Sequence, residues 1–170
     1  MKRLVLLFIA FSLFFCANAQ IRESFYGCKL GVTTKKRVLD NLKQLGHKYQ
    51  YDKENNCYYI ENVTFAGEQW SSCQFNFYKD TLSLVGFSLL SDKEDVIDLY
   101  NRNIENVKTK YSKIEGKMTS DNQDHKLCYF DDGIVVLSIG YKIEEGNHGY
   151  LIYQSKKLIN QMHEDAYNDM

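Results

Sequence analysis

Residues 57–90 read CYYIENVTFAGEQWSSCQFNFYKDTLSLVGFSLL, and this stretch decides the fold of the chain. Three runs within it, 57–65, 73–78 and 82–90, are rich in Tyr, Phe, Val and Leu and follow a period of two. The turn signals Ala66-Gly67-Glu68 and Lys79-Asp80 separate the runs. The stretch therefore predicts three antiparallel strands in a meander, with one apolar face that a second layer must cover.

One amphipathic helix is predicted before this meander and another after it. The first is capped by Thr33 or Thr34, whose hydroxyl can accept hydrogen bonds from the first free amides, and it ends at Gly46. The second opens with Ser91 and Glu94 at the spacing of a capping box. Their apolar faces consist of Val38, Leu39, Leu42 and Leu45 in the first helix, and of Ile97, Tyr100, Ile104, Val107 and Tyr111 in the second.

The rest of the chain repeats this pattern of strands followed by a helix. Asp132-Gly133 is a strong hairpin signal between two apolar runs. The predicted elements are a polar loop at 116–124, strands at 126–130, 134–141 and 150–153, and a last helix at 156–167.

The predicted fold class is α+β, with an antiparallel sheet of about six strands and two or three helices on one face. The element order is α-βββ-α-βββ-α. Residues 20–170 are expected to form a single domain, because a domain of about 150 residues is common. The segments 33–90 and 91–153 each contain one helix and one meander, which suggests an internal duplication. The second face of the sheet is expected to stay open.

Residues 1–19 are predicted to be a secretory signal peptide. A positive start is followed by an apolar run from Leu4 to Phe15, which is shorter than the roughly 20 residues that span a membrane. Small residues in Ala17-Asn18-Ala19 suit cleavage before Gln20. Lipidation of Cys16 is the alternative, but the bulky Phe15 before it is unfavourable for lipoprotein processing. The mature chain is therefore expected in the periplasm or outside the cell, without a transmembrane segment.

Three further stretches resemble a known group of proteins. They are FYGCKLG at 25–31, VTFAGEQW at 63–70 and FNF at 75–77. Together with the first helix they are similar to small secreted Bacteroidetes proteins of unknown function. The tandem order of helix and meander also resembles the architecture of beta-lactamase-inhibitor-like proteins, which outer-membrane assembly lipoproteins share in half-size form. The resemblance implies a non-enzymatic envelope protein that binds a partner through an open sheet face.

Charge and motifs argue against several classes of function. The chain carries 21 Lys and Arg against 22 Asp and Glu, a net charge of −1, so it has no overall field that would attract nucleic acid. It contains no Gly-x-Ser-x-Gly elbow, Walker loop, dinucleotide-binding turn, Cys-x-x-Cys or His-Glu-x-x-His. We therefore expect no catalytic residues, no cofactor, no metal and no nucleic-acid partner.

An acidic cluster is the main candidate for other chemistry. It comprises Asp121, Asp124, His125, Asp131 and Asp132, whose oxygen atoms could hold calcium, but the spacing and glycine of an EF-hand are missing. Solvated turn residues are the preferred interpretation. Asp121 and His125 are also the candidate residues for an alternative function, a small periplasmic hydrolase. Separately, Asp80-Thr81-Leu82 matches a short acceptor pattern for O-glycosylation.

The mature chain would keep four cysteines: Cys28, Cys57, Cys73 and Cys128. In an oxidising compartment an even number favours disulfides. A hairpin turning at 66–69 would put Cys57 and Cys73 about five residues, roughly 17 Å, out of register, which is too far for a bridge. Three alternatives stay open: Cys28–Cys57 with Cys73–Cys128, Cys28–Cys73 with Cys57–Cys128, or four buried free thiols.

Aromatic residues supply the best candidates for partner binding. Tyr and Trp suit a surface that is partly wet and partly apolar. We predict an exposed aromatic strip near Trp70, with Tyr58, Tyr78, Tyr129 and Tyr153, that contacts a protein or glycan of the cell envelope. A secreted enzyme inhibitor is the alternative, in which the loop at 116–124 would enter the cleft of an enzyme.

Overall fold

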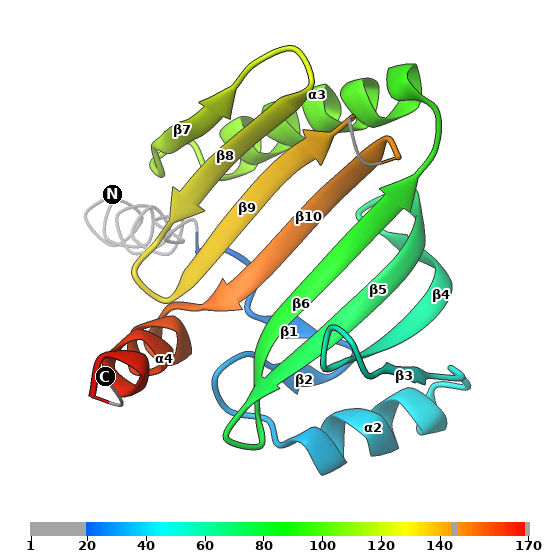
Figure 1. Cartoon of the computed structure of the whole chain (residues 1–170), viewed down its shortest axis with the longest axis vertical. Helices are drawn as coiled ribbons and strands as arrows, with labels where there is room; N and C mark the ends of the chain where they lie inside the picture. Colours follow the sequence, from blue (N-terminus) through cyan, green and yellow to red (C-terminus); the bar gives the residue numbers. More distant parts are fainter. Residues whose placement is uncertain (1–19, 144–145, 169–170) are drawn as a thin grey trace, which may run out of the picture.

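The computed structural model describes residues 20–143 and 146–168, so the predicted leader with Cys16 lies outside the described residues. The helices and strands appear in Figure 1. The strands are β1 Ser24–Phe25, β2 Cys28–Lys29, β3 Gln50–Asp52, β4 Cys57–Phe65, β5 Glu68–Tyr78, β6 Thr81–Leu90, β7 Gly116–Asp121, β8 His125–Asp131, β9 Val135–Lys142 and β10 His148–Ser155. The helices are α2 Lys35–Gln44, α3 Lys93–Lys110 and α4 Lys156–Asn168.

The α+β class and the antiparallel sheet are confirmed, but the strand number was wrong. The main sheet has eight strands in the order β3-β4-β5-β6-β10-β9-β8-β7. The two additional strands, β3 and β7, are the edges of the sheet. In β7 every residue except the half-buried Ser120 is exposed, so the apolar alternation that marks inner strands is missing. This is why the segment 116–124 looked like a loop.

The two halves of the chain have the same element order. A helix precedes a four-stranded meander in each half: α2 with β3 to β6, and α3 with β7 to β10. The last strands of the two meanders, β6 and β10, pair with each other at the centre of the sheet, with Phe87 opposite Leu151. The predicted order α-βββ-α-βββ-α is therefore corrected: each meander has four strands, and the β1–β2 hairpin precedes α2. Duplication of the two halves stays a prediction.

The predicted meander at 57–90 is present. The hairpin between β4 and β5 turns at Ala66 and Gly67, with φ of 55° and 85°, and the next hairpin turns at Lys79 and Asp80, with φ of 44° and 66°. Two-residue turns with positive φ match the natural twist of the strands that they connect. Local sequence therefore determines these hairpins.

The first two helices start close to the predicted positions. Thr34 caps α2, since its hydroxyl accepts a hydrogen bond from the amide of Arg37. In α3 the cap is Asp92 instead of Ser91, because the Asp92 carboxylate accepts from the amide of Asp95 at 3.0 Å. Among residues 20–143 and 146–168, no helix has the length and apolar character needed to cross a membrane.

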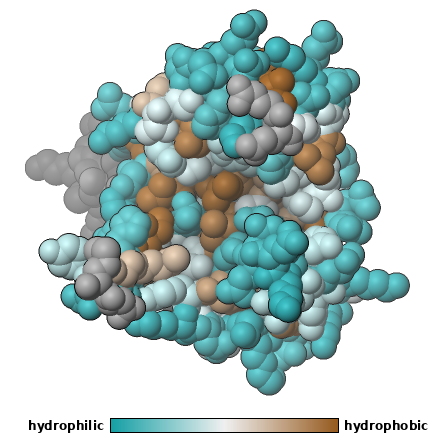
Figure 2. Space-filling model, viewed as in Figure 1, coloured by the Kyte–Doolittle hydropathy of each residue, from teal (hydrophilic) through white to brown (hydrophobic). Residues whose placement is uncertain are grey.

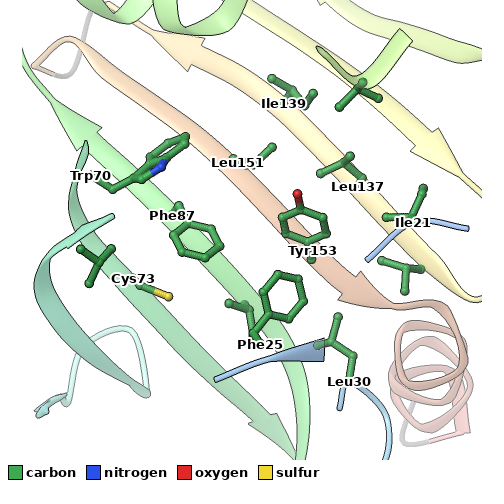
Figure 3. Packing of buried hydrophobic residues seen from close by; sticks show 14 of the residues in the cluster. Ile21, Phe25, Leu30, Trp70, Cys73, Phe87, Leu137, Ile139, Leu151 and Tyr153 are labelled. Atoms are coloured by element: carbon green, nitrogen blue, oxygen red, sulfur yellow. The ribbon is translucent and has the colours of Figure 1, made fainter. Parts of the chain in front are cut away.

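One face of the sheet, here called the covered face, contains the main core (Figure 3). Phe25 of the β1–β2 hairpin packs on Tyr153 with ring centroids 4.7 Å apart, and Phe65 stacks on Phe87 at 4.0 Å. Helix α2, the small hairpin and α3 cover this face, and Val38 of α2 belongs to the same cluster of buried residues. The core therefore depends on both halves of the chain.

Helix α4 does not lie with the other two helices. Phe75 and Phe77 contribute to the covered face, whereas Tyr78 points away from it. The Tyr78 hydroxyl donates a hydrogen bond to the Asp165 carboxylate of α4. Leu158 of α4 is buried, yet it stands outside the main core cluster. The prediction of helices on only one face is therefore corrected: α4 packs against one end of the opposite face, called the second face below.

Candidate functional site

The second face of the sheet has a hollow and apolar middle. Cross-strand pairing places Leu127, Gly140 and Tyr150 in one row of this face, and Val136, Gln154 and Leu84 in another. Figure 2 views this face, and apolar side chains gather in its hollow, surrounded by hydrophilic ones. The half-buried apolar residues of the face are Leu84, Leu127, Val136 and Ile152.

A groove lies where α4 meets this face. The α4 groove, as we name it, has a volume of about 1070 Å³ and is lined by Lys117, Tyr129, Asp131, Val136, Gln154 and Ile159, among others. Strands β8, β9 and β10 provide Asp131, Val136 and Gln154 as direct neighbours in one cross-strand row. Lys117 and Tyr129 form a pair in the next row. The volume lies just above the usual range of about 300 to 1,000 Å³ for small-molecule sites.

Electrostatics in the groove centre on Asp131. Its carboxylate accepts a hydrogen bond from Lys156 Nζ at the start of α4 and another from the Gly133 amide at 2.8 Å. Partial burial by itself would raise the pKa of Asp131, but these hydrogen bonds and the charges of Lys156 and Lys117 outweigh it and hold the pKa below its usual range. Asp131 is thus an ionised acceptor at neutral pH, which makes it unsuitable as a general acid.

Tyr150 lies on the second face towards the other end of β10, and it is not among the residues that line the groove. Its Oη lies 3.4 Å from His125 Nε2, and the His148 ring packs against its ring edge-on. Burial raises the pKa of Tyr150, and the nearby Tyr129 adds to this shift. Tyr150 therefore stays neutral and offers a hydroxyl group beside Gly140 and Ile152.

Of the five predicted aromatic residues, only Tyr129 lines the α4 groove. Trp70 is 2% exposed and donates from Nε1 to the Phe65 carbonyl at 3.1 Å, and Tyr153 is 6% exposed in the core. The regular pairing between β4 and β5 is interrupted at Asn62 and Ser71, and Asn62 has a positive φ of 52°. This irregularity turns Trp70 onto the covered face, so the expected exposed strip near Trp70 is not present.

The other two predicted tyrosines lie apart from each other. Tyr58 is on the covered face, where it packs with Tyr49, Tyr51 and Phe77 at the β3 edge. Tyr78 is on the second face, but its hydroxyl is bonded to α4. The predicted set is therefore divided between the core, the β3 edge, the α4 contact and the groove.

The four cysteines within the described residues are free thiols, and all are buried. Burial raises the pKa of each thiol, and the nearby Asp52 charge raises that of Cys57 further. Neither of the two open disulfide patterns is present in the structure. A protonated, buried thiol is a weak nucleophile.

The acidic cluster does not converge on one point. Asp121 pairs with Lys126 at 3.2 Å, and Asp124 lies 3.7 Å from Lys93. Asp132 accepts backbone amides instead. Within the described ranges no three His, Cys, Asp or Glu side chains are grouped as metal ligands. Asp121 and His125, the pair named for a hydrolase, thus have different partners.

Two other predicted features can be placed in the fold. The segment 116–124 was expected to be a protruding loop, but most of it pairs with β8 as strand β7. Only a tight turn at 122–124 remains, and the Asn122 side chain closes it by accepting a hydrogen bond from the His125 amide. Thr81 of the O-glycosylation pattern is half-buried at the start of β6 and pairs with Thr34. Its glycosylation stays a prediction.

Sequence reasoning missed most of the groove residues. The alternation in β10 could have identified Gln154, because Leu151 and Tyr153 face the core and the residues between them must point the other way. Ile159 belongs to the last predicted helix, but nothing in the local sequence indicates on which face of the sheet that helix packs.

No family model, curated protein or solved structure matches this chain.

Proposed function

We propose that this protein is an exported, non-enzymatic binding module of the cell envelope and that its ligand lies in the α4 groove. The observation that carries the proposal is the groove itself: apolar Val136 and Ile159 lie beside the polar groups of Gln154, Asp131 and Lys117. A concave, largely apolar surface with a few convergent polar groups is typical of binding sites.

The chemistry of the described residues supports binding over catalysis. The carboxyl groups with shifted pKa values, Asp40, Asp52 and Asp131, are all shifted downward. A hydrolase that uses a general acid needs a carboxyl with a raised pKa. The resemblance to beta-lactamase-inhibitor-like proteins stays a prediction.

Filling the groove tests this proposal without knowledge of the ligand. Val136→Trp would place a bulky side chain in the groove, whereas Tyr59→Trp changes the same face at β4, outside the groove. The immobilised mature proteins would be exposed to an envelope extract, and retained protein and carbohydrate would both be quantified. We expect V136W to retain roughly tenfold less of some component and Y59W to match the wild type. Equal retention by V136W and wild type would refute the proposal.

A further inference from the structure

The charges that line the α4 groove balance each other. Besides Lys117, Asp131 and Lys156, the lining includes Lys113, Glu115 and Asp132, which makes three basic and three acidic side chains. Lys156 is held by Asp131, and Asp132 is occupied by backbone amides. The groove therefore has no excess positive charge for a phosphate, an anionic lipid headgroup or nucleic acid, and it suits an uncharged ligand.

The strands below the groove offer nothing to a peptide backbone. β8 pairs with β7 and β9, β9 pairs with β8 and β10, and β10 pairs with β9 and β6. Extended peptides usually bind by adding a strand to a free sheet edge. The floor strands β8, β9 and β10 are inner strands whose amides and carbonyls already bond each other, so a ligand on them must be recognised by side chains. The edge strand β7 borders the groove through Lys117.

The side chains of the floor match the surface of a sugar ring. Tyr129 is a partly exposed aromatic ring, and Val136 beside it is apolar. One face of a pyranose consists of C–H groups that pack on an aromatic ring, while its rim carries hydroxyl groups. The Asp131 carboxylate and the Gln154 amide are planar groups on either side of Val136 in one cross-strand row. Such groups can bond two adjacent hydroxyls at once.

We infer that the α4 groove binds an uncharged saccharide chain, with a sugar ring stacked on Tyr129 and hydroxyl groups bonded by Asp131 and Gln154. This inference rests on the proposed function and names the ligand class of the same site. Ile159 of α4 forms a side wall, so the chain would lie between the helix and the sheet.

Calorimetric titration with defined sugars tests the inference. The probes are short linear glucans, α-linked and β-linked, a β-linked chain of N-acetylglucosamine, and an oligogalacturonate as the charged counterpart. We expect at least one uncharged probe to bind with a Kd of about 1 mM or tighter. Tyr129→Ala should weaken this binding roughly tenfold, and Tyr59→Ala should leave it unchanged. The affinity for the uncharged probe should stay the same between about 50 and 500 mM NaCl, because an uncharged ligand forms no ion pair with the protein that salt could screen.

The outcomes separate the inference from the proposed function. If no uncharged probe binds, or if Y129A binds as well as wild type, while envelope retention still depends on Val136, the ligand class is wrong and the groove remains a binding site for a protein. Preference for the oligogalacturonate would also overturn the inference. If V136W retains envelope material like the wild type, both proposals fail.

Discussion

The hydroxyl end of Tyr150 lies over Gly140 on the neighbouring strand, where a Cβ on Gly140 would come within 2.4 Å of Tyr150 Oη. The same Cβ would also lie 2.6 Å from the carbonyl oxygen of Lys126. Glycine at this position therefore lets Tyr150 extend across β9 towards His125 on β8. This contact shapes the second face beside the α4 groove.

Gly140→Ala should destabilise the protein by about 1 to 3 kcal/mol, because both the Tyr150 ring and the Lys126 backbone would have to move. Urea unfolding followed by circular dichroism would measure the loss. The matched control is Gly86→Ala in β6, where the added Cβ would meet only the flexible Gln74 side chain. A cost for G140A no larger than that for G86A would show that the close approach is not maintained in solution.

Trp70→Ala should cost about 3 to 5 kcal/mol of unfolding free energy, since the largest core side chain would be lost. Trp70→Phe should cost less, although it leaves the Phe65 carbonyl without its donor. Tyr129→Ala, on the second face, should change stability by less than about 1 kcal/mol. Thermal unfolding of the three variants tests this ranking, and a W70A protein as stable as the wild type would contradict the buried position.

The thiols of the native mature protein should resist iodoacetamide at pH 8, because burial keeps them protonated and inaccessible. In denaturant without reductant, mass spectrometry should show all four cysteines alkylated. Fewer labels without reductant than with it would reveal a disulfide that forms on export. Cys28 and Cys73, which have no exposed surface, should react after Cys57 and Cys128 during partial unfolding.

Asp132 connects the N-terminal segment to the β8–β9 turn. Its Oδ2 accepts from the Ile21 amide at 2.7 Å, and its Oδ1 accepts from the amides of Ile134 and Val135. Asp132→Asn can preserve the turn but places a donor against Ile21, so it should speed hydrogen exchange at Ile21 selectively. Asp132→Ala should remove all three bonds and cost about 1 to 3 kcal/mol. Unchanged exchange at Ile21 in D132N would contradict this role.

The Asp131–Lys156 pair should make stability depend on pH in the acid range. Because the folded-state pKa of Asp131 is lowered, its contribution is present above the unfolded value of about 3.9 and is lost as pH falls through the folded pKa. Asp131→Asn and Lys156→Gln should each cost at most about 1 kcal/mol at pH 7, since both side chains are partly exposed. The difference between D131N and wild type should vanish near pH 2. A difference that persists there would exclude an ionic origin.

Some expectations failed because the deciding contacts are not local. The alternation that identified β4 to β6 arises where one face of a strand is buried, and the edge strand β7 lacks that constraint. Trp70 and Cys73 are three residues apart, which in a regular strand places them on opposite faces. The irregular pairing at Asn62 and Ser71 brings both into the core, and the composition of these strands does not indicate it.

The amino-acid sequence by itself determined the helices α2, α3 and α4 and the two hairpins of the 57–90 meander, because capping residues, turn residues and hydrophobic periodicity act over a few neighbouring positions. Only the tertiary structure decided which side of the sheet α4 occupies, and with it the groove that contains Tyr129, Val136 and Ile159. An amphipathic helix needs an apolar surface to cover, and this sheet offers one on each face. Asp165 of α4 contacts Tyr78 on the second face, and these two residues are 87 positions apart in the chain.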